Sequence, residues 1–417
     1  MLFTKYIRSA HENISMLFNK RINTFKMENV FVSTMTSYSW REASSVIFAA
    51  KPSLQETMGK DLNNMLMAHT RNFNPSKFDY RLLMLKRSGL SSFMANAYVF
   101  PGGMVELSDF STKWWTVFNN AGISNEKLMQ VSSSITGPRP PMFENSVTLS
   151  KANISKNDHF PVDLTMRIAA IRETFEETGI LLLTSSGDEN KEPSVYTAKD
   201  LDLKMWRDKV HNNASFFIDL CLENKVCPNI WCLQEWWNWL TPNVGHRRYD
   251  TIFYVCCLSK IPAAWADQSE VTEIKWCTPE EILEENRNGS VFLAPPQIYE
   301  LSRLLNFKKI KELDQFSKKR ECRGIERWLP VVASSTDGAI SVLPGDDLYP
   351  ENPPLEGDFA NPEYSFTIDE LRSKSRNLNR LEINGITCFI QNNSTPTCGH
   401  VPSSKYPYKQ PVIQSFL

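Results

Sequence analysis

The segment RETFEETG, from Arg172 to Gly179, crowds three glutamates beside a glycine. Like charges three or four residues apart on a helix repel each other, by roughly 0.2–0.5 kcal/mol per pair. Carboxylates in a last helical turn also face the negative end of the helix dipole. A bound divalent cation would compensate for both effects. A solvated acidic face is the simpler interpretation of the three glutamates by themselves, so other sequence features must decide between the two.

The residues before Gly179 predict an amphipathic helix that ends at this glycine. Its apolar stripe repeats at helical spacing: Leu164, Ile168, Ile171 and Phe175. The acidic positions fall on the opposite side: Glu173, Glu176 and Glu177. Ala169 and Ala170 lie one turn earlier and leave room for a large ligand to approach the carboxylates. Hard cations such as Mg²⁺ or Mn²⁺ prefer oxygen ligands of this kind.

Composition excludes several classes of protein. The chain has 417 residues with 41% hydrophobic content, which is ample for a buried core and suggests two or three domains. Its formal net charge of −1 provides no global basic field, so no nucleic-acid partner is expected. The nine cysteines show no CxxC spacing, which indicates reduced thiols. No apolar run reaches the ~20 residues that a transmembrane helix needs.

Strand-like segments alternate with a few helices along the chain. Five strands are expected: Trp40–Lys51, Asp79–Ser88, Asn96–Glu106, Tyr249–Leu258 and Val271–Cys277. Besides the acidic helix, surface helices are expected at 278–289 and 295–307, because each begins near proline. This alternation predicts a layered α/β or α+β domain with a mixed sheet between helices.

The main domain is expected to span residues 40–310. Residues 1–39 would form a tail or a targeting segment, and residues 311–417 a partly irregular C-terminal extension rich in Pro, Asn and Ser. An insertion at about 110–162 interrupts the main domain. Its composition, including GPRPPMFE at 137–144, is poor in core-forming residues.

Both ends of the chain carry weak targeting features. The first 29 residues are basic, contain Ser and have few acidic residues, as in a mitochondrial transit peptide, although a frayed tail fits equally well. The chain closes with Ser415–Leu417, SFL, which partly matches a peroxisomal signal but lacks its basic middle residue. A location in the mitochondrion or the peroxisome is therefore expected.

Two separated segments together resemble the Nudix box, Gly-x5-Glu-x7-Arg-Glu-U-x-Glu-Glu-x-Gly-U, in which U is a bulky aliphatic residue. Gly103, five residues and then Asp109 match its first part, and the segment from Arg172 matches its second part. Asp109 replaces a glutamate, and Thr174 stands at a position that is usually aliphatic. The spacer has 62 residues, 110–171, instead of seven. Since the closure entropy of a loop grows only logarithmically with its length, the two halves can still meet.

Outside the box, the resemblance narrows to Nudix hydrolases that act on coenzyme A and acyl-CoA, the subgroup called Nudix motif 19. The segment 82–103, LLMLKRSGLSSFMANAYVFPGG, is similar to the stretch before the box in these enzymes, except that Asn96 stands near a usual glycine. Four more segments look like this subgroup: WLTP at 239–242, RRYDT at 247–251, PPQIYEL at 295–301 and LPGD at 343–346.

The resemblance implies a Nudix fold and cleavage of the pyrophosphate in CoA or its thioesters, which gives 3′,5′-ADP and (acyl-)4′-phosphopantetheine. It assigns Mg²⁺ or Mn²⁺ binding to four residues: Glu173, Glu176, Glu177 and the carbonyl of Gly103. Metal ions must neutralise the anionic pyrophosphate before water can attack phosphorus. Arg172 would orient Asp109. Glu176 or Glu177 would take the proton of the water, and Glu270 is a further candidate base.

Three arginines are candidate phosphate ligands, since guanidinium matches phosphate geometry: Arg87, Arg247 and Arg248. Structural ion pairs are the alternative role for each of them. The tryptophan-rich run 231–240 fits an adenine-stacking surface, but core packing is the more frequent role of tryptophan. Three aromatic residues of the insertion fit either an acyl-binding lid or an internal packing cluster: Trp114, Trp115 and Phe118.

Other functions remain open at this point. A Nudix hydrolase of another nucleoside-diphosphate-linked small molecule, such as ADP-ribose or a nucleotide sugar, would use the same box. Capped RNA is a weaker alternative because the charge of the chain is near neutral. A catalytically inactive Nudix-fold binding module is the rival from a different class. Acyl-chain preference and oligomeric state are left open by the sequence.

Overall fold

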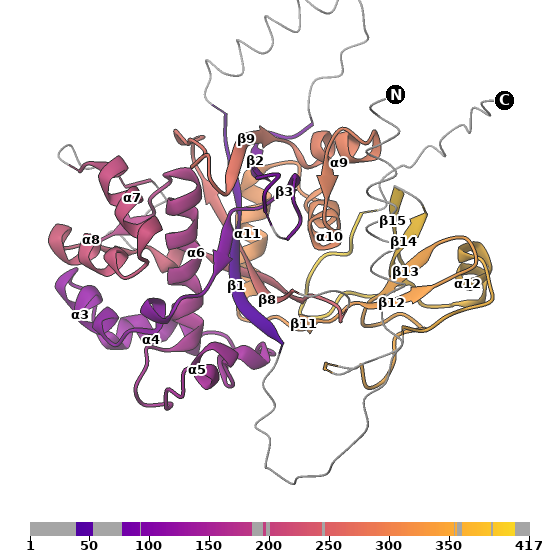
Figure 1. Ribbon diagram of the computed structural model, residues 1–417, viewed down its shortest axis with the longest axis horizontal. Helices are drawn as coiled ribbons and strands as arrows, with labels where there is room; N and C mark the ends of the chain where they lie inside the picture. The colour runs from indigo at the N-terminus through magenta and orange to yellow at the C-terminus, as the bar shows by residue number, and fades with distance from the viewer. Residues whose placement is uncertain are drawn as a thin grey trace, which may run out of the picture.

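A mixed sheet of nine strands lies at the centre of the computed structural model (Figure 1). The structure describes residues 39–52, 77–91, 93–185, 195–196, 201–243, 247–353, 355–356, 361–384 and 387–404. The strands follow the order β10-β3-β2-β1-β8-β7-β11, with β4 paired to β1 and β9 paired to β2. They are β1 (Trp40–Ala50), β2 (Arg81–Arg87), β3 (Ala97–Val99), β4 (Gly102–Met104), β7 (Gln234–Leu240), β8 (Arg248–Leu258), β9 (Val271–Cys277), β10 (Phe292–Leu293) and β11 (Arg327–Trp328). The predicted mixed α/β fold and its five strands are confirmed.

The parallel pair β1–β8 forms the middle of this sheet. The two strands pair over their whole length, from Trp40 opposite Arg248 to Ala50 opposite Leu258. The second half of β1 is a continuous apolar run that is completely buried. Such runs are typical of strands covered on both faces, whereas strands with one solvated face alternate in polarity. The central strands therefore need helices on both sides.

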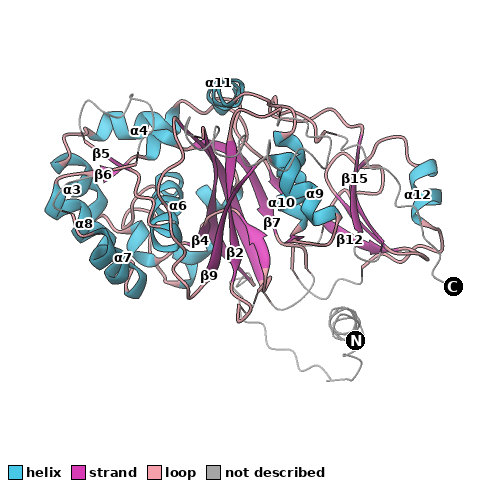
Figure 2. Cartoon of the chain, turned by 90° about the horizontal axis from the view of Figure 1, so that it is seen from above, coloured by secondary structure: helices cyan, strands magenta, loops and turns pink. Residues whose placement is uncertain are grey.

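Helices cover both faces of the sheet (Figure 2). On one face, α6 packs against β1 and β4, with further helices outside it. The other face carries α11 against β7 and β8, and α10 packed on α9. The bounds are α6 (Val162–Thr178), α7 (Leu203–Asn212), α8 (Phe216–Asn224), α9 (Pro279–Arg287), α10 (Pro295–Leu304) and α11 (Ile310–Glu321). As predicted, α6 ends at Gly179, which adopts the left-handed conformation that glycine tolerates best.

The insertion forms a packed helical layer rather than the loose segment that its composition predicts. It contains α3 (Lys113–Asn120), α4 (Asn125–Ser133) and α5 (Val147–Lys151). The two ends of the insertion lie next to each other, because the N–H of Phe160 donates to the carbonyl of Phe110 at 2.8 Å. The Glu42 carboxylate of β1 accepts hydrogen bonds from the backbone N–H groups at the start of α5. The insertion therefore leaves and rejoins the domain at one point and is anchored to the sheet.

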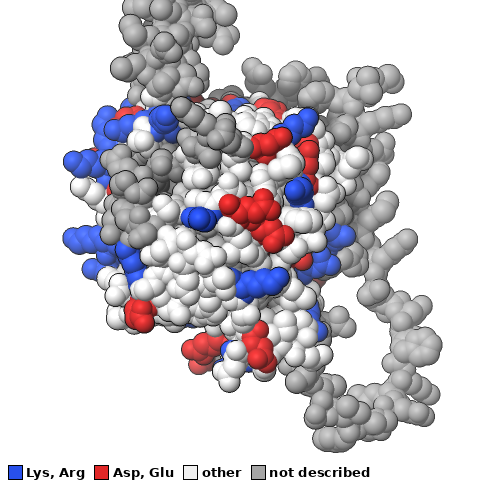
Figure 3. All heavy atoms as spheres, turned by 90° about the vertical axis from the view of Figure 1, so that its left-hand side faces the viewer, with Lys and Arg blue, Asp and Glu red and all other residues white. Residues whose placement is uncertain are grey.

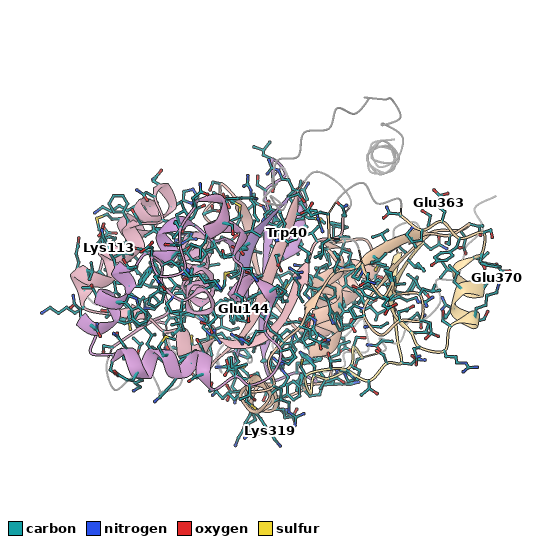
Figure 4. All side chains as sticks on the ribbon, turned by 90° about the horizontal axis from the view of Figure 1, so that it is seen from below. Trp40, Lys113, Glu144, Lys319, Glu363 and Glu370 are labelled. Carbon is teal, nitrogen blue, oxygen red and sulfur yellow. The ribbon has the colours of Figure 1, made fainter. Side chains whose placement is uncertain are left out.

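A second sheet follows the main domain. It has the order β12-β13-β14-β15, all antiparallel, and carries α12 on one face. The elements are β12 (Val331–Ser334), β13 (Ala339–Val342), α12 (Ile368–Lys374), β14 (Asn379–Asn384) and β15 (Thr387–Asn392). In Figure 4, Lys113 of α3 and Glu370 of α12 mark opposite ends of the molecule, with Trp40 between them. This extension is thus more regular than expected, although α11 and β11 pack on the main sheet. The boundary near residue 310 stays a prediction.

The remaining short elements are η1 (Leu107–Phe110), η2 (Pro141–Phe143), β5 (Leu183–Thr184), β6 (Cys227–Pro228) and η3 (Ile230–Cys232).

All nine cysteines are free thiols. Among the described residues, no helix combines the length and the apolar character that crossing a bilayer requires. The face turned to the viewer in Figure 3 carries acidic and basic side chains separated by neutral surface. The two segments with targeting features, 1–29 and 415–417, lie outside the described residues.

Candidate active site

A cavity of about 1220 Å³ opens beside the C-terminal half of α6. Its walls come from segments that are far apart in the sequence: the turn before β4, the end of β2, the α7–α8 loop, the loop before β9, the start of α10 and the C-terminal sheet. All three glutamates of the acidic motif line it, together with Gly103 and Arg172. Glu176 and Glu177 are only 8% and 4% exposed, which excludes a solvated acidic face.

The glycine turn and the acidic helix are in direct contact, as the split Nudix box requires. A Cβ atom at Gly103 would lie 2.4 Å from Oε2 of Glu173. The N–H of Gly102 donates to Oε2 of Glu177 at 2.8 Å. Gly102 has a φ of +141°, and a Cβ there would meet the carbonyl oxygen of Ser44 at 2.1 Å. Only glycine therefore allows β4 to lie between β1 and the glutamates.

Arg172 connects the two halves of the box. Its Nε and Nη2 donate to the two carboxylate oxygens of Asp109 at 2.9 and 2.8 Å, and Nη2 also donates to the carbonyl of Met104. Its Nη1 donates to Oε1 of Glu173 and of Glu176, at 2.9 and 2.6 Å. Arg172 thus lies against Asp109 across the insertion. The shorter aspartate reaches the guanidinium because it lies in η1, where it also accepts from the N–H of Glu106.

Two departures from the Nudix pattern have local explanations. The Thr174 hydroxyl donates to the carbonyl of Ala170 one turn earlier, so its polar atom is satisfied inside the helix. Asn96 has a φ of +62°, in the left-handed region, where asparagine is tolerated better than most residues other than glycine. Both substitutions are therefore compatible with the fold.

The electrostatics of the acidic cluster are unfavourable without a cation. Burial raises the pKa of Glu173 to about 8, despite the opposing effect of Arg172. Burial also raises the pKa of Glu176. The pKa of Glu177 lies well above its ordinary value, first because of burial and then because of repulsion by Glu173. Positive charge near these carboxylates would relieve both effects.

The residues fit a divalent cation in donor chemistry, since they offer buried carboxylate oxygens and the backbone of a glycine turn. Among the described residues, no three acidic, histidine or cysteine side chains already converge as a complete metal site. Arg172 holds oxygens of Glu173 and Glu176, and Gly102 holds one of Glu177. Metal binding would therefore require these side chains to exchange some of their present partners.

Other polar groups border the cluster. Glu270, the further candidate base, lines the cavity and raises the pKa values of Glu176 and Glu177 through repulsion. His211 of α7 was not predicted; its Nδ1 lies 3.8 Å from Oε2 of Glu176. Arg207, from the same helix, donates through Nε to the carbonyl of Glu176 at 2.7 Å. No sequence motif marks these α7 residues, because only the tertiary packing of α7 on α6 brings them to the site.

The three predicted phosphate ligands separate into two groups. Arg87 lines the cavity, where Nε donates to the carbonyl of Phe93, and Arg247 also lines it. Arg248 is not among the lining residues. Its Nε donates to the carbonyl of Thr241 and its Nη1 to the carbonyl of Leu355. Its placement favours the alternative role, a structural contact, over the predicted contact with substrate.

The aromatic segments also have mainly structural roles. In the run 231–240, Trp236 and Trp239 are buried and donate to the Glu300 carboxylate of α10. Trp239 is the only tryptophan of this run that borders the cavity among the described residues. The predicted lid residues of the insertion do not line the cavity: Trp114, Trp115 and Phe118. They pack within the insertion and against α8: Phe118 stacks on Phe160, and Trp114 lies against Phe217 of α8.

The chain is similar to known proteins over most of its length. The family model described as NUDT19 Nudix domain matches residues 40–304, and the model described as NUDT19 C-terminal domain matches residues 332–392. The chain is 42% identical to Acyl-coenzyme A diphosphatase NUDT19 of Xenopus laevis, over 82% of this chain and 90% of that protein. It is 35% identical to the human protein of the same name, over 75% of this chain and 81% of that protein.

The crystal structure of a NUDIX hydrolase from Alicyclobacillus acidocaldarius is also similar. The similarity covers 66% of this chain and 96% of that chain, with 14% sequence identity and a TM-score of 0.43.

Proposed function

This chain belongs to the NUDT19 family of Nudix hydrolases, and we propose on that basis that it hydrolyses the pyrophosphate bond of coenzyme A and acyl-CoA. Water adds to one phosphorus and the bridging P–O bond breaks, which gives 3′,5′-ADP and (acyl-)4′-phosphopantetheine. The contact of Gly103 with Glu173 is the observation that carries the proposal, because it joins both halves of the interrupted box. The names of the relatives support the choice of substrate.

Nudix hydrolases generally use divalent metal ions. For this chain we assign Mg²⁺ or Mn²⁺ to Glu173, Glu176, Glu177 and the carbonyl of Gly103. When bound, the metal would supply positive charge that neutralises the diphosphate oxygens. The raised pKa values of the three carboxylates support this assignment, since their burial is compensated only in part by Arg172.

The other residues of the site position the reaction. Arg172 joins Asp109, Glu173 and Glu176 in one ion-pair network, which gathers the acidic side chains beside the glycine turn. A carboxylate of the cluster, Glu176 or Glu177, takes the proton of the attacking water. Glu270 is the further candidate base, because it borders the cavity near Glu176 and Glu177.

The arginines at the cavity bind the anionic substrate. Arg87 and Arg247 both line the cavity, and Arg87 lies near enough to Glu177 to lower its pKa against the effect of burial. Guanidinium groups bind phosphate oxygens in bidentate fashion. We assign the phosphates of CoA to these two arginines and no longer to Arg248.

A panel of pyrophosphate-linked compounds tests the substrate. Purified protein is incubated with Mg²⁺ and CoA, acetyl-CoA, lauroyl-CoA, ADP-ribose, a nucleotide sugar or capped RNA, and the products are identified by mass spectrometry. The proposal predicts the highest kcat/KM on a CoA compound. Preference for ADP-ribose or a nucleotide sugar would leave only the superfamily assignment, and preference for capped RNA would favour an RNA hydrolase. Metal binding without any hydrolysis would favour the inactive binding module.

Location in the cell is a proposal as well. The basic residues 1–29 favour the mitochondrion, and the terminal SFL favours the peroxisome. A fluorescent tag at the N-terminus masks the first feature, and a tag at the C-terminus masks the second. If the N-terminal feature acts as a signal, only the C-terminally tagged protein reaches mitochondria. If neither tagged form reaches either organelle, both targeting assignments fail.

A further inference from the structure

The cavity extends beyond the catalytic cluster into a cleft between the start of α10 and the C-terminal sheet. Pro296 and Gln297 of α10 line one side of this cleft. Pro330, Val332 of β12 and Ile383 of β14 line the other side. None of these five side chains is charged. The cleft therefore differs from the end of the cavity at α6, where acidic side chains and Arg172 gather.

The two sides of the cleft are fixed relative to each other. The Tyr299 hydroxyl of α10 donates to Oδ1 of Asn379 in β14 at 2.8 Å. The Asn392 side chain of β15 donates to the same hydroxyl at 2.9 Å. These groups are buried. This polar contact therefore ties α10 to the C-terminal sheet close to the residues that line the cleft.

The register of the C-terminal sheet explains which side chains reach the cleft. Val332 pairs with Ser341, and Ser341 pairs with Leu381, so these residues share one face with Ile383. The opposite face, which includes Val331 and Ile340, packs with α12 in a separate apolar cluster. One face of the sheet therefore stabilises the extension, and the other is available to form the wall of the cavity.

Gln297 has a buried side-chain oxygen without a partner. Its side chain lines the cavity and is 9% exposed, and its Oε1 accepts no hydrogen bond from the described residues. Leaving a buried acceptor unsatisfied costs about 1–3 kcal/mol. An N–H group of a ligand in the cleft would satisfy it.

We propose that this cleft holds the pantetheine arm and the acyl chain of the substrate, an inference that rests on the proposed function. Gln297 Oε1 accepts a hydrogen bond from an amide N–H of pantetheine, and Val332 and Ile383 contact the acyl chain. The pantetheine arm is uncharged and carries two secondary amides, which match an apolar cleft with one free acceptor. In this proposal the C-terminal sheet determines the specificity for acyl-chain length.

The alternative occupant of the cleft is the nucleotide half of the substrate. Adenosine 3′-phosphate carries negative charge, and burying it in an uncharged cleft would be unfavourable. Two arginines that line the same cavity lie at its catalytic end: Arg172 contacts Glu173, and Arg87 lies near Glu177. The charge of these two arginines therefore favours the catalytic end of the cavity for the nucleotide, and the uncharged lining of the cleft favours the acyl half.

A series of acyl-CoA substrates of increasing chain length tests whether Val332 and Ile383 contact the acyl chain. The kcat/KM is measured for CoA, acetyl-CoA, octanoyl-CoA and palmitoyl-CoA with wild type, Val332→Phe and Ile383→Ala. Val332→Phe is expected to lower the value for the long chains by about tenfold or more and to leave free CoA within about twofold, because the larger side chain fills only the acyl site. Ile383→Ala is expected to raise the kcat/KM for the long chains relative to free CoA, because the smaller side chain enlarges the acyl site.

The matched control is Thr336→Phe, which adds the same side chain at an exposed position of the β12–β13 hairpin that does not line the cavity. It should leave the chain-length profile unchanged. If Val332→Phe lowers kcat/KM equally for free CoA and all thioesters, the assignment of the acyl chain is overturned.

Gln297→Leu tests the amide contact separately. The variant should raise the KM for CoA by about tenfold and leave the melting temperature equal or higher, since it removes an unpaired buried oxygen. A fall in melting temperature with an unchanged KM would show that Gln297 is only structural and would contradict the proposal.

Failure of the proposed function gives a different result, because wild type would then release no 3′,5′-ADP from any CoA compound. In that case wild type, Val332→Phe and Thr336→Phe are titrated calorimetrically with lauroyl-CoA in EDTA. Weaker binding by Val332→Phe but not by Thr336→Phe would still support the cleft. Equal binding by all three proteins would overturn it.

Discussion

Arg172 forms two parallel hydrogen bonds with the Asp109 carboxylate, although 62 residues separate them in the chain. The hydrogen bond between Phe160 and Phe110 explains how this contact survives, because the insertion begins and ends at one point. The acidic helix and the glycine turn consequently meet as they would with a short spacer. The insertion adds a helical layer and leaves the geometry of the site intact.

Substitution of Asp109 tests this contact. Asp109→Ala removes the partner of a buried guanidinium, and breaking such a pair typically costs about 3–5 kcal/mol. We expect a lower free energy of unfolding in urea and a loss of activity. Asp109→Glu, which restores the residue usual in the Nudix pattern, should retain most of both. Equal stability of wild type and Asp109→Ala would show that the pair contributes nothing.

Metal affinity should depend on the acidic helix. Glu177→Gln removes one carboxylate from the cluster, so calorimetry with Mn²⁺ should show binding at least about tenfold weaker than in wild type. Glu223→Gln, on the exposed face of α8, is the control and should bind Mn²⁺ as wild type does. Absence of saturable Mn²⁺ binding in wild type would contradict the metal assignment.

The glycine turn should tolerate no side chain. In Gly103→Ala, the new Cβ would lie 2.4 Å from Oε2 of Glu173, so either the turn or the helix must move. Small displacements at a catalytic centre cost much more in rate than in stability. We expect kcat on CoA to fall by about 10²-fold with only a small change in melting temperature. A variant with wild-type kcat would show that this close approach is not needed.

The metal-free protein should lose stability as the pH rises. The folded-state pKa of Glu173 is raised to about 8, so its contribution is fully present below its ordinary pKa and is lost as the pH rises through 8. Between pH 5 and pH 8 in EDTA, the melting temperature of wild type should therefore fall more steeply than that of Glu173→Gln. Parallel curves for the two proteins would argue against a raised pKa at this position.

The aromatic residues of the insertion should matter for stability and not for substrate choice. Trp114 is buried, and its Nε1 donates to the carbonyl of Ser108. Trp114→Ala should lower the free energy of unfolding by about 3–5 kcal/mol, as is usual for large buried aromatic side chains. The ratio of kcat/KM for palmitoyl-CoA and acetyl-CoA should stay the same. A changed ratio in a well-folded variant would revive the acyl-binding lid.

Local sequence patterns predicted the elements that carry the box. The apolar run of β1, the glycine turn of β4 and the periodicity of α6 up to Gly179 each reflect a short-range physical constraint. The contact between Gly103 and Glu173 followed from the family pattern, and loop-closure entropy explained only why a long spacer permits it.

Other features depend on packing between distant segments and were not predictable in this way. The insertion has a polar composition, yet its spaced apolar residues, such as Leu128, Phe118 and Phe160, are completely buried. The strands of the C-terminal sheet are too short to stand out. His211 reaches the site only because α7 packs on α6. Arg248 follows Arg247, which lines the cavity, but its own side chain turns into the structure.

Product release by wild type and Glu177→Gln tests the central claim most directly. Each protein is incubated with CoA, with Mg²⁺ or with EDTA, and 3′,5′-ADP and 4′-phosphopantetheine are quantified by mass spectrometry. The account predicts equal amounts of both products from wild type with Mg²⁺, almost none in EDTA, and a rate at least about 10²-fold lower for Glu177→Gln. Equal release by Glu177→Gln and wild type, or undiminished release in EDTA, would contradict it.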